Sequence, residues 1–172
     1  MSFRIVKIMK VSALIVVFFT ALFAQAQSKE KIRKGDDAID FAAITEDGAA
    51  VRLSDLNDKY ILLDFTHIGC GPCWQSYPHL TEVQAKYKEN LRVVTFHIDD
   101  MKDKWKEFAE RRGIAVNWLT LWDIENKNDV MKQYQIDGFP YYFLIDETGK
   151  IVEKIFGYNK NKINSRLKKH LE

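Results

Sequence analysis

Two apolar runs in the middle of the chain show no alternation of polar and apolar positions. They are YILLDF, residues 60–65, and LRVVTFHI, residues 91–98, and a longer helical stretch lies between them. Strands that other elements cover on both faces have this continuous apolar pattern. The two runs and the helix between them therefore predict a βαβ unit.

Before this unit, the segment DFAAITEDGAAVRLSDL (residues 40–56) contains two short extended stretches around Asp47-Gly48. This dipeptide is typical of the tight turn of a β-hairpin. Ser54 is then expected to cap a short helical turn, because its hydroxyl can accept a hydrogen bond from a free backbone amide. The pattern predicts an N-terminal hairpin ahead of the βαβ unit.

A second helix is expected over residues 102–112, after the second apolar run. Its apolar residues fall on one side of the helix, and Gly113 can end it. The sequence WLTLW, residues 118–122, is expected to form a further short strand. Another helix is expected around residues 128–134.

The last part of the chain predicts a hairpin and a closing helix. The segment YYFLIDETGKIVEKIF, residues 141–156, has the pattern of two antiparallel strands with a turn at residues 147–150. Ile163, Leu167 and Leu171 follow at four-residue spacing, which is the apolar stripe of an amphipathic helix. Alternating strands and helices of this kind indicate the α/β class.

The first 26 residues have a different pattern from the rest of the chain. Arg4, Lys7 and Lys10 precede an apolar run over residues 11–24, and the small-residue site Ala-Gln-Ala ends at Ala26. This is the layout of a secretory signal peptide. The apolar run has about 14 residues, fewer than the roughly 20 that cross a hydrocarbon core. An uncleaved membrane anchor remains the alternative.

Residues 27–34 (QSKEKIRK) are polar and lack periodicity, so they are expected to be a linker to a domain over residues 35–172. Cleavage after residue 26 would leave 172 − 26 = 146 residues, the usual size of one domain. Removing the three basic residues of the leader changes the formal net charge from +2 to −1. The remaining chain is not basic, which argues against nucleic acid as a partner. We also expect the protein to be a monomer.

Both cysteines of the chain lie in HIGCGPCW, residues 67–74. A structural zinc site needs four ligands, and only His67, Cys70, Cys73 and the distant His97 can be drawn into one cluster. A purely structural disulfide would close a very short loop and remove little entropy from the unfolded chain. The context therefore favours redox exchange, and no metal is expected.

Cys70 follows a predicted buried strand and would occupy the N-terminus of the next helix. Free amides and the helix dipole stabilise an anion there by about 0.3 to 1 kcal/mol, so we expect a depressed pKa for the Cys70 thiol. Cys73, one turn further on, would be shielded from solvent. Cys70 is the predicted nucleophile and Cys73 the predicted resolving cysteine, and no cofactor is expected besides their disulfide.

The segment LLDFTHIGCGPCWQSYP, residues 62–78, resembles the active-site segment of the thioredoxin superfamily. Residues 35–172 are similar to its exported branch, the TlpA/ResA-like thiol-disulfide oxidoreductases, in the order of hairpin, Cys-Gly-Pro-Cys, Pro78, βα insertion, Gly-Phe-Pro, hairpin and final helix. The resemblance implies a thioredoxin-like α/β fold. A central mixed sheet would be flanked by helices, with an N-terminal β-hairpin extension and a βα insertion.

The resemblance also implies roles for three residues outside the cysteine pair. Asp64 matches the buried acid that accepts the proton of the second cysteine, and burial within an apolar run would raise its carboxyl pKa. A solvent-facing Asp64, or one paired with a lysine, is the alternative. Pro140 matches the cis-proline of the substrate loop. Phe139 would lie beside the active site, with a plain core aromatic as the alternative.

Gly71, Pro72 and Trp74 are expected to contribute to the substrate-binding surface around Cys70. Thioredoxins usually have Trp before the first cysteine and often Lys or Arg after the second, where this chain has Gly69 and Trp74. The partner surface therefore departs from the usual one. His67 could tune Cys70 or relay a proton, and an exposed loop histidine without a role is the alternative.

Gly-Pro between the cysteines, with a buried acid behind them, resembles the reducing members of the superfamily. The implied activity is reduction of disulfides in exported proteins of the periplasm or cell envelope, apocytochromes among them, with electrons from a membrane thiol carrier. Two alternatives stay open. A peroxiredoxin-like peroxide reductase would usually have Thr at the position of His67, and an exported copper-binding protein or metallochaperone would normally have more widely spaced cysteines.

Overall fold

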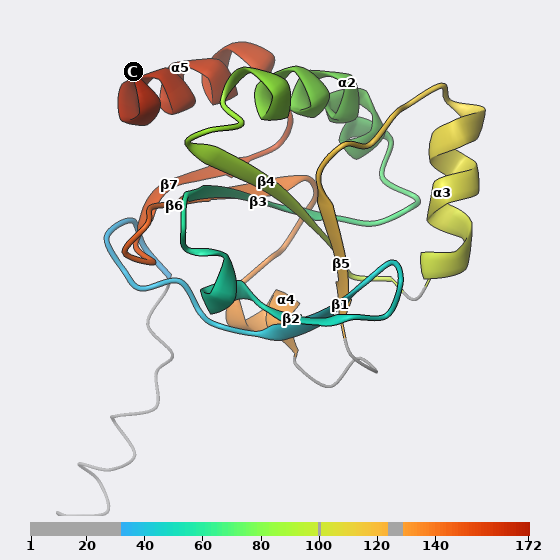
Figure 1. Ribbon diagram of the computed structural model, residues 1–172, viewed down its shortest axis with the longest axis horizontal. Coiled ribbons are helices and arrows are strands. Elements are labelled where there is room, and N and C mark those ends of the chain that lie inside the picture. The colour runs from blue at the N-terminus through green and yellow to red at the C-terminus, as the bar shows by residue number, and fades with distance from the viewer. Residues whose placement is uncertain (1–31, 100, 124–128) are drawn as a thin grey trace, which may run out of the picture. The chain divides into compact units, whose positions relative to one another are not determined.

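A sheet with the strand order β2-β1-β5-β4-β3-β6-β7 forms the centre of the domain (Figure 1). The computed structural model describes residues 32–99, 101–123 and 129–172. The predicted signal peptide and residues 27–31 of the predicted linker lie outside the described residues. The elements in chain order are β1 (Ala42–Thr45), β2 (Ala50–Arg52), the 3-10 helix η1 (Leu53–Leu56), β3 (Tyr60–Thr66), α2 (Gly71–Lys86), β4 (Leu91–His97), α3 (Lys102–Arg111), β5 (Leu119–Asp123), α4 (Val130–Gln133), β6 (Tyr141–Ile145), β7 (Ile151–Phe156) and α5 (Lys160–Leu171).

The predicted βαβ unit lies in the middle of the sheet. Strands β3 and β4 pair in parallel, from Tyr60 opposite Leu91 to Thr66 opposite His97, and α2 connects them. Strand β5 is also parallel to β4, whereas β1 is antiparallel to β5 and β6 is antiparallel to β3. The sheet is therefore mixed, as the thioredoxin-like fold requires.

Helices cover both faces of the sheet, which explains the continuous apolar sequences of β3 and β4. Helices α2, α3 and α5 pack on one face, where Leu62 of β3 contacts the core that contains Leu80 of α2. Helices η1 and α4 lie on the other face, where Phe65 packs with Tyr134. In Figure 1, α2 and α5 lie on the side of the sheet opposite to α4.

The predicted N-terminal hairpin is formed by β1 and β2, which pair antiparallel. Gly48 has φ +85°, a left-handed conformation that glycine adopts without strain, so the turn at Asp47-Gly48 is confirmed. The capping role expected for Ser54 is wrong. Ser54 lies inside η1, and its own backbone N–H donates to Asp40 Oδ1 at 3.0 Å. The Asp40 carboxylate thus satisfies the amide that a cap would serve.

The domain begins earlier than the linker prediction places it. Ile32, the apolar residue within the polar segment, is 7% exposed and belongs to one of the two cores. The Lys34 ammonium lies 2.7 Å from Glu153 Oε1 on β7, and the Gly35 N–H donates to the Ile151 carbonyl at 2.7 Å. Residues 32–34 are therefore packed on the domain and are not part of a free linker.

The predicted βα insertion consists of α3 and β5, which follow β4. Gly113 has φ +64° just after α3, as expected of a helix-ending glycine. Strands β6 and β7 form the predicted C-terminal hairpin, and Ile163 and Leu167 of α5 are buried. Helix α4 begins at Val130, and residue 128 of its predicted range lies outside the described residues. Within the described ranges, none of the helices combines the length and apolar character that crossing a membrane requires.

Candidate active site

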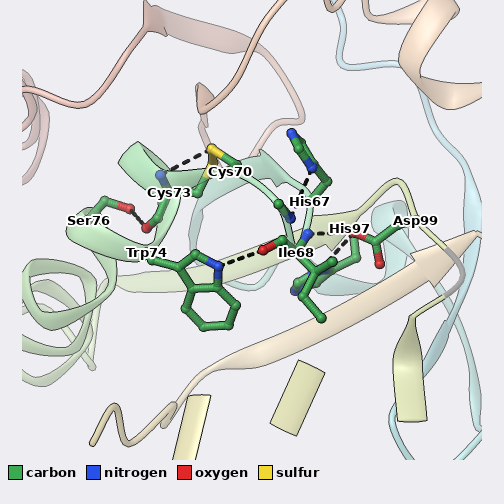
Figure 2. The surroundings of a disulfide bond; sticks show 9 residues. His67, Ile68, Cys70, Cys73, Trp74, Ser76, His97 and Asp99 are labelled. Carbon is green, nitrogen blue, oxygen red and sulfur yellow. Dashed lines mark hydrogen bonds and ion pairs between the residues drawn. A yellow bond between two sulfur atoms is a disulfide. The ribbon is translucent and has the colours of Figure 1, made fainter. Parts of the chain in front are cut away.

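The two cysteines form a disulfide at the N-terminus of α2, with their Cα atoms 5.3 Å apart (Figure 2). Cys70 is the N-cap of the helix, and its Sγ accepts a hydrogen bond from the Cys73 backbone N–H at 3.1 Å. Pro72 sits in the first turn, where a residue without an amide proton is well tolerated. The helix terminus thus offers Cys70 the environment that stabilises a thiolate.

The exposure of the two cysteines differs slightly. Cys70 is 5% exposed and Cys73 is 1% exposed. Gly71 and Pro72, between them, are both exposed and available to a partner. This arrangement is the one expected for an attacking Cys70 and a shielded resolving Cys73, although these roles remain predictions.

The loop that presents Cys70 links the end of β3 to the start of α2. The Cys70 N–H donates to the His67 carbonyl at 3.0 Å, and the Gly69 N–H donates to His67 Nδ1 at 3.2 Å. The Ile68 N–H donates to Asp99 Oδ2 at 2.6 Å, and the Ile68 carbonyl accepts from Trp74 Nε1 at 2.8 Å. We call residues 67–70 the redox loop, and its conformation is held by these four hydrogen bonds.

Trp74 does not belong to the substrate-facing surface where the sequence analysis places it. It is 8% exposed, its indole nitrogen donates to the redox loop, and its ring lies 5.1 Å from that of Tyr77. The Arg112 guanidinium covers the ring at 4.6 Å from the centroid. The side chain is drawn inward because one indole can fill the apolar space beside α2 and also satisfy a loop carbonyl.

The predicted cis bond between Phe139 and Pro140 is present. Phe139 is half-buried, and its ring meets the His67 ring with centroids 4.9 Å apart and an interplanar angle of 74°. This contact brings the loop before β6 against the redox loop, although the two are about 70 residues apart in sequence. His67 therefore contacts a residue of the predicted substrate loop. The sequence alone left the surroundings of His67 open.

Asp64 lies in the middle of β3, between Thr95 of β4 and Tyr142 of β6, and it is fully buried. Burial raises the pKa of its carboxyl to about 8, and the neighbouring Thr95 hydroxyl partly offsets this rise. Neither carboxylate oxygen has a partner at normal hydrogen-bond geometry within the described residues. The alternatives of a solvent-facing or lysine-paired Asp64 are therefore wrong.

The position of Asp64 relative to the cysteines follows from the sheet. Its side chain shares a face with that of Leu62, two residues earlier, and α2 covers this face. Tyr77, in the second turn of α2, has its pKa raised by burial and by the charge of Asp64. Asp64 thus lies beneath α2, near Tyr77 of its second turn, on the face of the sheet that this helix covers.

Sequence reasoning missed two polar residues of this site. Asp99 follows the end of β4 and holds the redox loop, and Ser76 Oγ donates to the Cys73 carbonyl at 2.7 Å. A usable signal existed for Asp99, because the carboxyl ends of neighbouring parallel strands meet at one edge of a sheet. Among the described residues, no group of three or more His, Cys, Asp or Glu side chains is placed to hold a metal ion.

Comparisons with known proteins agree with this geometry. Residues 34–154 match the AhpC/TSA family. The thiol-disulfide oxidoreductase ResA of a Bacillus cereus strain is 30% identical over 142 residues, which are 82% of this chain and 80% of that protein. ResA of Bacillus thuringiensis (strain Al Hakam) is 29% identical over 169 residues, which are 97% of this chain and 94% of that protein.

Solved structures give the same relationship. The thioredoxin domain of a thiol-disulfide oxidoreductase from Bacteroides vulgatus has a TM-score of 0.73 and 26% identity, and the match covers 82% of this chain and 99% of that one. A thiol:disulfide interchange protein from Bacteroides sp. also has a TM-score of 0.73, with 26% identity over 82% of this chain and 91% of that one. The chain therefore belongs to the AhpC/TSA family and, within it, to the ResA-like thiol-disulfide oxidoreductases of the thioredoxin superfamily.

Proposed function

We propose that this protein reduces disulfide bonds of exported proteins with a Cys70-Cys73 dithiol, outside the cytoplasm. The observation that carries the proposal is the placement of Cys70. Its sulfur caps α2 and accepts a hydrogen bond from a backbone amide of the helix. Cys70 also ends the redox loop, and this loop contacts the loop of cis-Pro140 through the rings of His67 and Phe139. A thiolate at this position is stabilised. The exposed Gly71 and Pro72 that follow it offer a surface on which an extended client segment can dock.

The proposed reaction has two exchange steps. The Cys70 thiolate attacks one sulfur of the client disulfide, and a mixed disulfide forms while the other client sulfur leaves as a thiolate and takes up a proton. The Cys73 thiol then gives its proton to Asp64, and the Cys73 thiolate attacks Cys70 Sγ. The Cys70-Cys73 disulfide forms and the second client sulfur leaves, so the client gains two electrons and the protein loses two.

Asp64 suits the second step because a carboxyl with a pKa of about 8 can take up and release a proton near neutral pH. Its burial beneath α2 also keeps bulk water from competing for this proton. Cys73, at 1% exposure, has few other routes for losing its proton. The carboxyl is thus proposed as the proton acceptor of the resolving cysteine.

Location and partners are part of the proposal. The basic and apolar leader supports export, with membrane anchoring as the alternative. The proposed clients are oxidised cysteines of exported proteins, apocytochromes awaiting haem among them. The Cys70-Cys73 disulfide would be reduced again by a membrane thiol carrier, because the glutathione and thioredoxin that keep thiols reduced act in the cytosol.

The peroxide-reductase and metallochaperone alternatives are not favoured. Relatives that match over most of this chain are named thiol-disulfide oxidoreductases. The cysteines are also only three residues apart and already joined in one disulfide.

Trapping of mixed disulfides in the native host tests the proposal. A Cys73→Ser variant cannot resolve the mixed disulfide, so client proteins should stay attached to Cys70 and be released by dithiothreitol. The matched control is a Cys70→Ser/Cys73→Ser double variant, which should trap nothing. Absence of adducts on Cys70, or adducts made only of cytoplasmic proteins, would contradict the proposal.

A further inference from the structure

Asp99 connects the redox loop to the insertion that contains α3. It lies just beyond the carboxyl end of β4, and its Oδ2 accepts from the Ile68 N–H at 2.6 Å (Figure 2). Its Oδ1 accepts from the Met101 N–H at 3.1 Å, immediately before α3. One carboxylate therefore fixes both the loop that carries Cys70 and the start of the neighbouring helix.

The C-terminal end of α3 also contacts the redox loop, indirectly through Trp74. The Ile68 carbonyl accepts from Trp74 Nε1 at 2.8 Å, and the Arg112 guanidinium covers the Trp74 ring. Arg112 is the C-cap residue of α3, and its guanidinium also donates to the Phe108 carbonyl at 3.1 Å. The Ile68 N–H is thus bound by Asp99, which also binds the N-cap residue of α3. The Ile68 carbonyl is bound by Trp74 of α2, whose ring the C-cap residue of α3 covers.

The buried ring of His97 lies next to the Asp99 carboxylate. His97 is 1% exposed, and its Nδ1 lies 4.0 Å from Asp99 Oδ2. The ring stacks on Trp122 with centroids 5.1 Å apart and lies 5.5 Å from Trp105. Burial alone would raise the pKa of Asp99, but the His97 ring and the two backbone amides outweigh it and hold that pKa below its ordinary value. Asp99 is therefore an ionised acceptor at neutral pH.

We infer that Asp99 is a positioning residue that keeps Cys70 at the N-cap of α2 once the disulfide is open. The inference rests on the proposed function, in which Cys70 and Cys73 are the redox couple. In the oxidised protein the S–S bond ties the Cys70 side chain to Cys73 of α2. In the reduced protein this tie is absent, and besides the backbone itself only non-covalent contacts hold the redox loop. Loss of the Asp99 contact therefore destabilises the reduced form more than the oxidised form.

Loosening of the redox loop shifts the Cys70 pKa in a defined direction. If the loop loosens, the Cys70 thiolate loses the helix amides that stabilise it, so the Cys70 pKa rises and the couple becomes more reducing. A purely electrostatic role predicts the opposite, because removing a nearby negative charge favours the thiolate and lowers the Cys70 pKa. A purely structural role predicts a loss of stability without any change in the Cys70 pKa.

The test uses Asp99→Ala in the full chain, with Asn159→Ala as the matched control. Asn159 Oδ1 caps α5 by accepting from the Lys162 N–H at 2.9 Å, so its loss costs a comparable helix cap far from the redox loop in sequence. The Cys70 pKa is measured from the pH dependence of alkylation of the reduced protein. The reduction potential is measured by equilibration with glutathione.

The Asp99→Ala variant should be alkylated at Cys70 about threefold to tenfold more slowly at pH 7. This factor corresponds to the net free energy of one hydrogen bond. Its disulfide should be correspondingly harder to reduce, and Asn159→Ala should match the parent in both. Asp99→Asn keeps one acceptor for two amides, so it should be intermediate and provides the readout if the alanine variant does not fold.

Three results would overturn the inference: an unchanged Cys70 pKa, a lowered one, or an equal change in Asn159→Ala. A parent protein without a Cys70-Cys73 couple in the same glutathione titration would instead refute the proposed function itself.

Discussion

The His67 ring contacts the Phe139 ring edge to face, with centroids 4.9 Å apart and an interplanar angle of 74°. This contact joins the redox loop to the loop that contains the cis Phe139-Pro140 bond. The strands that place the two loops are neighbours, because β3 pairs with β6 and Phe65 lies opposite Tyr141. A client that reaches Cys70 would therefore meet the Phe139 edge of the site.

Phe139→Ala should impair the reduction of a protein client while leaving the chemistry of Cys70 intact. The expected loss is about threefold to tenfold in kcat/KM for insulin reduction, because one partly buried aromatic contact is removed. The alkylation rate of Cys70 should stay at the parent value. Met131→Ala is the control, since Met131 is an exposed apolar residue of α4. Equal insulin reduction by both variants would rule out a docking role for Phe139.

Asp64→Asn should stabilise the oxidised protein increasingly as the pH rises from about 4 to about 8. The folded-state pKa of Asp64 is raised from 3.8 to about 8 by burial. Between these values the native state binds a proton that the unfolded state does not, so the free energy of unfolding falls by up to about 1.4 kcal/mol per pH unit. Asparagine does not titrate and removes this slope.

Urea unfolding at pH 5, 7 and 9 measures this effect. The exposed Asp103 of α3 provides the control, as Asp103→Asn should leave the slope of the parent unchanged. Parallel pH profiles for the parent and Asp64→Asn would show that Asp64 is ionised in the folded protein.

The same Asp64→Asn substitution should slow the resolution of a mixed disulfide at Cys70. Cys73 then lacks its proton acceptor, and the expected loss at neutral pH is at least about tenfold. Stopped-flow decay of a mixed disulfide with a fluorescent peptide thiol, measured from pH 6 to 9, checks it. The parent rate should follow a titration near pH 8, which the variant should lose. An unchanged rate and pH profile would make Asp64 a structural residue only.

Glu153→Gln should destabilise the domain by about 1 to 3 kcal/mol at pH 7, because buried Glu153 joins the N-terminal segment to α5. Its Oε1 lies 2.7 Å from Lys34 Nζ, 3.3 Å from Lys169 Nζ and 2.9 Å from His170 Nε2. Burial raises the pKa of Glu153, but the hydrogen bonds from these groups outweigh it and lower that pKa from 4.5 to about 2.

A lowered folded-state pKa stabilises the protein above the unfolded value, and this stabilisation is lost as the pH falls from about 4.5 to about 2. The parent and Glu153→Gln should therefore converge in urea unfolding near pH 2 to 3 and diverge at pH 7. Glu172→Gln, which removes a more exposed pair with Lys86, should match the parent. A constant difference across this range would contradict the titration of Glu153.

Local sequence determined much of the fold. The unbroken apolar runs required strands covered on both faces, and β3 and β4 are such strands. Asp47-Gly48 predicted a turn because glycine adopts a positive φ without strain. The same runs favoured a buried Asp64 over a solvent-facing or lysine-paired one, since a residue flanked by buried strand positions is desolvated with them, and the structure buries it fully. Each of these inferences depends on neighbours within a few residues.

Only the tertiary structure decided contacts between distant segments. Asp99 reaches Ile68 across 31 residues, and Lys34 reaches Glu153 across 119 residues. The inward position of Trp74 likewise depends on Arg112, which the insertion brings over its ring. Such partners are set by strand order and by which helix covers which face, and many sequences with the same local pattern could choose different ones. The redox chemistry could therefore be predicted from the cysteine pair. The strand order could have suggested Asp99 as a neighbour of the redox loop, whereas its bond to Ile68 and the cover of Trp74 by Arg112 became visible only in the tertiary structure.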